Sequence, residues 1–167
     1  TALAASAGLH VGDDHGIVVD EHMRTSDPDI HAVGDAVAYR HAVTGRSMRI
    51  PLAGPANRAG RIAGEDAATG AGPPMGPVLG TAIVRVFDLT AASTGLNATQ
   101  ADHLGIEHRE VWVPAPHHAD YFPGAQPLML KLVFRPDDGK LLGGQVVGAA
   151  GVDKRIDVLA TALTFGA

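Results

Sequence analysis

The residue of this sequence that most directly suggests chemistry is Asp35, near the end of the stretch DIHAVGDA at residues 29–36. A short apolar run, Ile30 to Val33, leads through Gly34 to this carboxylate. Such a run is typical of a buried strand, and an ionised group is costly to bury without partners. A carboxylate at the end of a strand can accept hydrogen bonds from sugar-like hydroxyls, or it can cap a nearby helix. We therefore expect a polar partner there, and residue types alone leave both interpretations open.

Other residue types that carry chemistry are either absent or poorly arranged. The chain has no cysteine, which excludes disulfides, thiolate metal sites and a cysteine nucleophile within these residues. Its nine histidines invite a metal hypothesis, and His117 and His118 form the densest pair. Adjacent residues of an extended strand point to opposite faces, and no carboxylate cluster completes a site. We predict no metal centre.

Composition sets the broad class. The 167 residues are 46% apolar with a mean hydropathy of +0.09, which is enough for one or two small domains with real cores. The net charge of −5 is mild and the 13 basic residues are scattered, so we expect no nucleic-acid partner. No apolar run approaches the roughly 20 residues of a membrane span, and the first residues lack the features of a targeting segment. These observations predict a cytoplasmic protein that does not enter the membrane.

The elements that would position Asp35 occupy the first half of the chain. Compact β-branched runs predict strands at 16–20 and 29–35, and a helix is expected from about residue 55 to residue 69, with Gly70 as its stop. Several residues of this helix are too small for an ordinary core stripe: Ala56, Ala59, Gly60, Ala63, Gly64 and Ala67. They would let a backbone or a flat ligand come close, or they reflect no more than an alanine-rich composition.

A Pro/Gly-rich break at 70–77 is the best candidate for a domain boundary, dividing the chain into 1–76 and 77–167. The expected elements after the break are one strand or two linked ones at 81–96, a helix at 97–105 with Asn97 and Gln100 as a capping box, a half-buried strand at 107–113, a hairpin around RPDDG, and a helix from Val152 with a possible cap at Asp153. They predict an antiparallel sheet with helices on one face.

The stretch TSDPDIHAVGDA resembles the second flavin-binding motif of the pyridine nucleotide-disulfide oxidoreductases. In that family the terminal aspartate, here Asp35 after Gly34, holds the ribityl chain of FAD. The stretch IPLAGPANRAGRIAGEDA is similar to the next family element, a helix whose N-terminus points at the pyrimidine end of the isoalloxazine ring. The resemblance therefore implies flavin contacts at Gly34, Asp35, Leu52, Ala53 and Gly54.

The second half resembles the dimerisation domain of the coenzyme A-disulfide reductase, NADH oxidase and NADH peroxidase branch, through VFDLTAASTGLNATQA, HADYFPGAQPLMLKLVF and GGQVVGAAGVDKRIDVLATAL. Tyr121, in DYFPGA, lies in a segment similar to a family loop near the partner's substrate site, where a tyrosine can orient the substrate. Alternatively, Tyr121 and Phe122 pack the dimer interface. Asn57 sits where coenzyme A reductases can place a substrate contact, although an ordinary helix-surface Asn is the alternative.

Several family features are missing from these residues. The first flavin motif, Gly-x-Gly-x-x-Gly, the nicotinamide-binding domain and the redox-active cysteine all precede this segment in the family, and none is found here. The His-Pro motif of the glutathione reductase branch is also absent, which favours the single-cysteine branch. The final LATALTFGA shows a helical pattern with no stop signal. We interpret the chain as a fragment whose dimerisation domain is truncated at its C-terminus.

The predicted fold class is α/β plus α+β: the end of a FAD-binding Rossmann-like domain at 1–76, followed by an antiparallel-sheet dimerisation domain at 77–167. The resemblance implies a homodimeric oxidoreductase that uses FAD and NAD(P)H, with a disulfide, coenzyme A disulfide, persulfide, peroxide or oxygen as acceptor. The fragment alone is expected to be inactive. The alternatives are an NADH oxidase or peroxidase of the same branch, or a stand-alone dimerisation module without catalysis.

Overall fold

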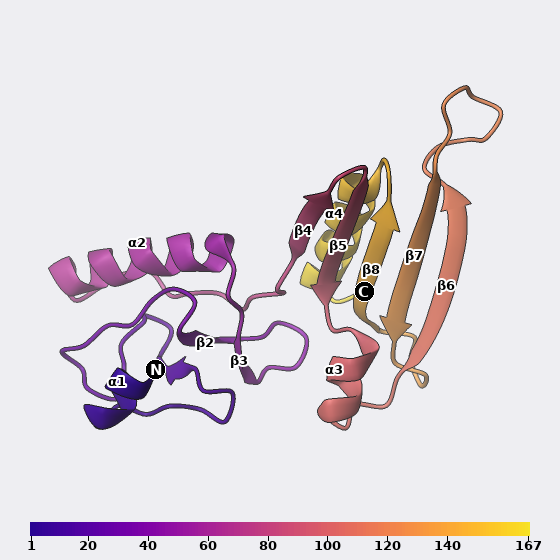
Figure 1. Cartoon of the computed structure of the whole chain (residues 1–167). Coiled ribbons are helices and arrows are strands. Elements are labelled where there is room, and N and C mark those ends of the chain that lie inside the picture. The colour runs from indigo at the N-terminus through magenta and orange to yellow at the C-terminus, as the bar shows by residue number, and fades with distance from the viewer. The chain divides into compact units, whose positions relative to one another are not determined.

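The structure is a computed structural model that describes residues 1–167, and it divides into two compact units, Thr1–Val78 and Leu79–Ala167 (Figure 1). None of the helices is long enough and apolar enough to cross a membrane. Each unit has a sheet and a hydrophobic core of its own.

The first unit is built around a three-stranded sheet of order β1-β2-β3. Its elements are α1 (Ala2–Ser6), β1 (Ile17–Val18), β2 (Val37–Arg40), β3 (Ser47–Arg49) and α2 (Ala53–Thr69). The central strand β2 pairs in parallel with β1 and antiparallel with β3. The core of the first unit comprises Met23, Val37, Tyr39, Ile50, Ala59, Ile62, Ala63 and Val78. Strand β2 and helix α2 therefore share one core.

The backbone conformations of the two flanking residues define the ends of helix α2. Leu52 precedes it with extended backbone (φ −133°), and Gly70 follows it in the left-handed region (φ 72°) that favours glycine. The predicted helix at 55–69 is thus confirmed, with a start two residues earlier. Ala59, Ile62, Ala63 and Asp66 form its buried side.

The prediction of a buried strand at 29–35 is wrong. Only His31 forms a bridge there, to Arg24, and both Ile30 and Val33 are about 40% exposed. The strand follows Asp35 instead, as the buried β2, and it is β2 that pairs with β1. The segment before Asp35 is held by isolated backbone hydrogen bonds, from Thr25 N–H to Ile30 O at 2.8 Å and from Ala32 N–H to Met23 O at 3.0 Å, and by the side-chain contact of His31, without a strand ladder. Its larger apolar side chains, Ile30 and Val33, stay exposed.

The second unit is a five-stranded antiparallel sheet of order β4-β5-β8-β7-β6. Its elements are β4 (Ala82–Val86), β5 (Leu89–Gly95), α3 (Ala98–His103), β6 (Arg109–Pro116), β7 (Pro127–Phe134), β8 (Leu141–Gly148) and α4 (Val152–Thr164). Helix α4 packs on β5 and β8 and buries Val152 and Ile156 against Ala92, Leu128 and Val146 (Figure 1). The predicted hairpin is confirmed as β7 and β8.

Local signals at the helix ends of this unit were only partly predictive. The capping box of α3 is confirmed, because Gln100 N–H donates to Asn97 Oδ1 at 2.8 Å and Asn97 N–H donates to Gln100 Oε1 at 3.0 Å. The expected cap at Asp153 is wrong: Gly151 is the N-cap of α4, and Asp153 lies in its first turn. The sequence showed no stop signal for the last helix, but α4 ends at Thr164, with Phe165 as its C-cap.

Strand β6 lies at the edge of the sheet, and the prediction that it is half-buried is wrong. All eight of its residues are exposed, because the strand has a neighbour, β7, on one side only and helix α4 packs on β5 and β8 instead of on β6. The strand contains two prolines, Pro114 and Pro116, within its ladder to β7. Prolines lack an N–H and are confined to edge strands for that reason.

Candidate functional site

The candidate site starts from the turn at Gly34 and Asp35, directly before β2. Gly34 has a φ of 88°, in the left-handed region where a side chain would be strained. Asp35 is exposed, and its carboxylate makes no hydrogen bond or ion pair within the chain; only its backbone oxygen accepts a bond, from Arg49 Nε at 3.4 Å. The chain therefore offers an outward-facing carboxylate with its hydrogen-bonding capacity unused.

The register of β2 and β3 brings the predicted flavin contacts to one end of the sheet. Ala38 pairs with Arg49 in this antiparallel ladder. Asp35 precedes β2 by two residues, and Leu52 follows β3 by three, so both segments leave the sheet at the same end. This places the Gly34–Asp35 turn and the start of α2 at the same end of the small sheet.

The start of α2 can receive a polar ligand group. No side chain caps this end of the 17-residue helix, so the N–H groups of Ala53 and Gly54 have no intrahelical partner. Pro55 contributes no N–H, and space is open around Gly54, where a Cβ would meet nothing within 4 Å. Free N–H groups at the positive end of a helix favour partial negative charge on a ligand. This end of the helix and the Asp35 carboxylate are therefore both open to a polar ligand.

Asn57 is exposed on the first turns of α2, and its Nδ2 donates to the Ala53 backbone oxygen at 2.9 Å. That bond lies within the helix and uses the amide nitrogen of the side chain, not its oxygen. The structure brings Asn57 close to the helix start, and a substrate contact at its remaining oxygen stays a prediction.

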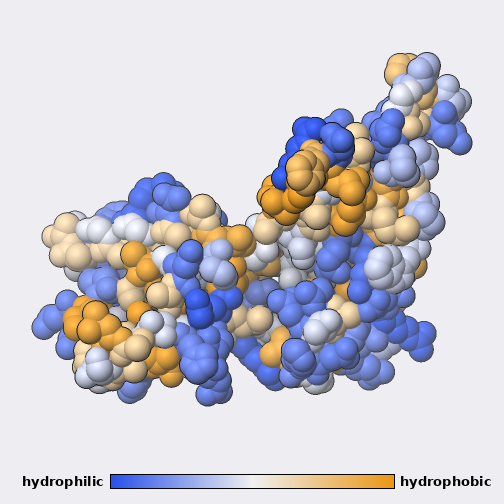
Figure 2. All heavy atoms as spheres, viewed as in Figure 1, coloured by the Kyte–Doolittle hydropathy of each residue, from blue (hydrophilic) through white to orange (hydrophobic).

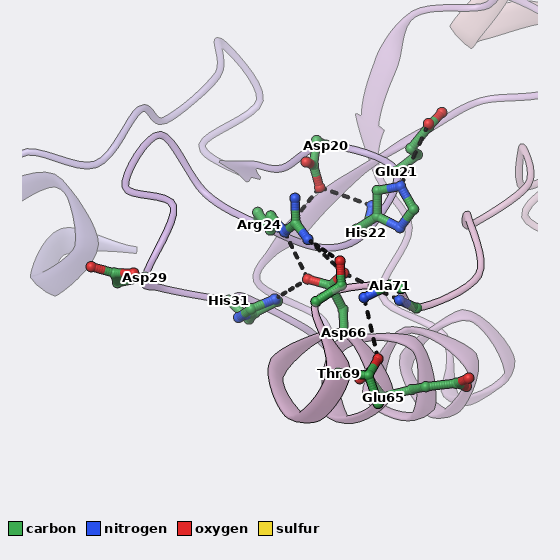
Figure 3. Close-up of polar contacts among 12 residues, drawn as sticks. Asp20, Glu21, His22, Arg24, Asp29, His31, Glu65, Asp66, Thr69 and Ala71 are labelled. Carbon is green, nitrogen blue, oxygen red and sulfur yellow. Dashed lines mark hydrogen bonds and ion pairs between the residues drawn. The ribbon is translucent and has the colours of Figure 1, made fainter.

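Sequence reasoning missed a cluster that fastens the Asp35 segment to α2. Asp66, 2% exposed, accepts hydrogen bonds from Arg24 Nε and Nη2, both at 2.7 Å, and its Oδ2 lies 2.8 Å from His31 Nε2. Figure 3 shows both side chains directed at the Asp66 carboxylate from the loop opposite α2. Gly72 N–H adds a bond at 3.3 Å. We call Arg24, His31 and Asp66 the clasp.

The clasp has a clear electrostatic signature. The hydrogen bonds from Arg24, followed by the contact with His31, hold the pKa of the Asp66 carboxyl well below its usual range, against the opposing effect of burial. The hydrogen bond with Asp66 in turn raises the pKa of Arg24. An aspartate inside the buried side of a small-residue helix was the available sequence signal, but nothing in the sequence identifies partners 35 and 42 positions away.

Tyr121 belongs to the second unit, in the loop between β6 and β7. Its side chain is 88% exposed, and Phe122 beside it is 63% exposed. The base of the loop is fastened by His117, whose backbone N–H donates to Gln126 O at 2.9 Å and whose backbone oxygen accepts from Arg155 Nη2 at 2.6 Å. The loop is therefore held by hydrogen bonds at its base, and it carries an exposed tyrosine.

The neighbouring histidines do not point to opposite faces, which corrects that expectation. His117 and His118 lie in a bend after β6, and their ring centroids are 4.1 Å apart. No group of three or more His, Cys, Asp or Glu side chains is arranged to hold a metal ion.

Comparison with known proteins assigns both units to one family. Residues 81–167, more than half of the chain, match the pyridine nucleotide-disulphide oxidoreductase dimerisation domain, and residues 1–60 match the pyridine nucleotide-disulphide oxidoreductase family. The chain belongs to the pyridine nucleotide-disulphide oxidoreductases. The resemblance inferred from the motifs, and the fold class that it implied, are confirmed.

Individual members of this family show which activities its relatives carry. The chain is 35% identical to the NAD(P)H coenzyme A polysulfide/persulfide reductase of Pyrococcus horikoshii, over 98% of this chain and 36% of that protein. It is 37% identical to the NADH oxidase of Methanocaldococcus jannaschii, over 96% of this chain and 35% of that protein. The solved NAD-dependent persulfide reductase of A. fulgidus superposes with a TM-score of 0.90 at 43% identity, over 99% of this chain and 30% of that one. The chain spans about a third of the length of these curated relatives.

Proposed function

We propose that this chain is the C-terminal part of a homodimeric, FAD-dependent oxidoreductase that passes electrons from NAD(P)H to a disulfide or persulfide. In this proposal residues 1–76 complete the FAD-binding domain, and residues 77–167 form the dimerisation domain. The observation that carries it is the convergence of the unpaired Asp35 carboxylate and the uncapped start of α2 at one end of the small sheet. Such an enzyme would work in the cytoplasm, where its nucleotide substrate is available.

Each contact has a chemical task in this proposal. Asp35 accepts hydrogen bonds from the ribityl hydroxyls, which are charge-assisted and hence stronger than neutral ones. The N–H groups of Ala53 and Gly54, next to Leu52, face the pyrimidine end of the ring, where they stabilise negative charge. A bound flavin supplies the two-electron redox chemistry that no side chain provides. Residues 1–167 alone would be catalytically inactive, since they contain neither a cysteine nor the first dinucleotide motif.

The second unit supports the homodimer. Besides its family assignment, it exposes a cluster of large apolar side chains on β4, β5 and the turn between them, which Figure 2 shows as a continuous hydrophobic area. Its members, each more than half exposed, are Val84, Val86 and Leu89, which share one face of the hairpin, and Phe87 in the turn. Exposed apolar patches of this kind mark interaction surfaces. We assign the exposed Tyr121 to the partner's active site, where it orients the substrate.

A second candidate, reduction of oxygen or peroxide, is favoured by the identity to an NADH oxidase. It uses the same flavin contacts and differs in the acceptor.

The test is the absorbance spectrum of the whole purified protein, followed by anaerobic addition of NADH or NADPH and then of coenzyme A disulfide, a persulfide or oxygen. A flavin spectrum that bleaches with the nucleotide and recovers with coenzyme A disulfide or persulfide supports the reductase, and recovery with oxygen alone supports the oxidase. A protein without flavin that forms a dimer in light scattering would instead indicate a non-catalytic dimerisation module.

A further inference from the structure

One buried hydroxyl connects the core of the first unit to the Gly34–Asp35 turn. Tyr39, in β2, is 2% exposed and belongs to the core beneath α2. Its hydroxyl donates to the Gly34 backbone oxygen at 3.0 Å and accepts from the Gly34 N–H at 3.2 Å. A single side-chain atom therefore holds both polar backbone groups of one residue.

The residue that is held needs this support. Gly34 lies in the left-handed region, with a φ of 88°, and glycine in that region has more conformational freedom than any other residue. The flanking residues Val33 and Asp35 are exposed, so packing does not restrain them. Two other hydrogen bonds reach backbone oxygens of the turn: the Val37 N–H donates to Gly34 O at 3.2 Å, and the side-chain Nε of Arg49 donates to Asp35 O at 3.4 Å. The Tyr39 hydroxyl is the link that joins the turn to a fully buried side chain.

The hydroxyl is suited to this task because it stays protonated. Burial raises the pKa of Tyr39, in opposition to the hydrogen bond with Gly34. A neutral hydroxyl can donate and accept at once, whereas a phenolate could only accept. The bridge to both backbone groups of Gly34 is therefore kept throughout the neutral pH range.

We propose that Tyr39 is a positioning residue for the flavin: its hydroxyl fixes the two peptide groups that flank the Gly34 Cα and thereby aims the Asp35 carboxylate at the ribityl hydroxyls. This inference rests on the proposed function of Asp35. Tyr39 itself lies in the core, so in this proposal it acts on the cofactor only through the turn. Its contribution is to prepare the turn before binding, which removes an ordering cost that the ligand would otherwise have to meet.

The experiment is a double-mutant cycle in the whole protein with Tyr39→Phe and Asp35→Ala, in which FAD is titrated into the apoprotein and its dissociation constant is measured. Phenylalanine keeps the ring in the core and removes only the hydroxyl. Tyr39→Phe is expected to raise the dissociation constant on the order of tenfold. In the Asp35→Ala background the same change should have little further effect, because the carboxylate that it aims is gone. The circular dichroism of the bound flavin should also change in Tyr39→Phe.

The outcomes separate this inference from the proposed function. Unaltered FAD binding in Tyr39→Phe, or an equal weakening with and without Asp35, would overturn the positioning role while leaving the flavin contact of Asp35 intact. Wild-type FAD binding in Asp35→Ala would refute that contact itself.

A control variant covers the case in which Tyr39→Phe lowers the melting temperature of the apoprotein. Ile62→Val shortens a side chain in the same core and leaves the hydroxyl in place. If Ile62→Val lowers the melting temperature but binds FAD normally, loss of packing is not the cause of weakened binding. If Ile62→Val weakens FAD binding as much as Tyr39→Phe does, the role of Tyr39 is structural and the inference fails.

Discussion

Replacing Asp35 by alanine should weaken FAD binding without destabilising the protein. The carboxylate is exposed and makes no hydrogen bond or ion pair within the chain, so its removal takes nothing away from the folded apoprotein. The hydrogen bonds that the proposal assigns to this carboxylate are therefore made to the ligand. This separation of binding from stability is a direct consequence of the geometry of the turn.

The size of the effect follows from the kind of bond. A hydrogen bond to a charged group contributes roughly 1.5–3 kcal/mol, which corresponds to a rise of roughly 10- to 150-fold in the dissociation constant. The assay is a titration of apoprotein with FAD, together with the flavin content after dialysis and the melting temperature of the apoprotein. The melting temperature should stay at the wild-type value, since surface substitutions away from specific contacts shift stability little.

The matched control is Asp29→Ala. Asp29 is an exposed aspartate six residues earlier in the same loop, and its side chain likewise makes no hydrogen bond. The Asp29→Ala substitution removes the same charge from the same segment as Asp35→Ala does. Equal weakening of FAD binding by both variants would therefore indicate a general charge effect. That result, or a lowered melting temperature of Asp35→Ala, would refute the reasoning.

Further predictions concern the clasp, the second sheet and the exposed loop. Because the folded-state pKa of Asp66 is depressed, its stabilising effect is complete above the ordinary pKa of roughly 4 and is lost as the pH falls below it. The difference in melting temperature between wild type and Asp66→Asn should accordingly shrink on acidification from pH 7 to pH 3, and a constant difference would contradict the ion-pair assignment. Gly143→Ala should unfold the second unit, since a Cβ there would overlap the Leu96 backbone carbonyl, as circular dichroism would reveal. Tyr121→Phe should leave FAD content and melting temperature unchanged while it lowers turnover on the order of tenfold in steady-state assays; full turnover would leave Tyr121 with no role in substrate orientation.

Elements with local signals could be predicted from the sequence. The stop of α2 at Gly70 and the capping box of Asn97 and Gln100 depend on residues within one turn of the helix end. The apolar run before Asp35 was misleading because its contacts are with the preceding loop and with Asp66, far away in the sequence, and not with a strand of the sheet. The exposure of β6 was likewise unpredictable, since it depends on strand order and not on the alternation within the strand.

The residues of the candidate site also differ in whether the sequence could reveal them. Asp35 and the start of α2 were found through a resemblance of motifs, because residue types alone did not distinguish a ligand contact from a helix cap. Tyr39 and Asp66 were not found, because each acts through partners that only the fold brings near. A tyrosine in a strand and an aspartate in a helix carry no visible mark of such a role.

The two prolines of β6 have a consequence for how large an assembly can grow. A sheet edge with free N–H groups invites another strand, and copies added in this way extend without limit into fibres. Pro114 and Pro116 cannot donate to such a strand, and this edge of the sheet is therefore a poor template. Open-ended polymerisation through this edge is thereby disfavoured, which fits the closed pair of the proposed homodimer.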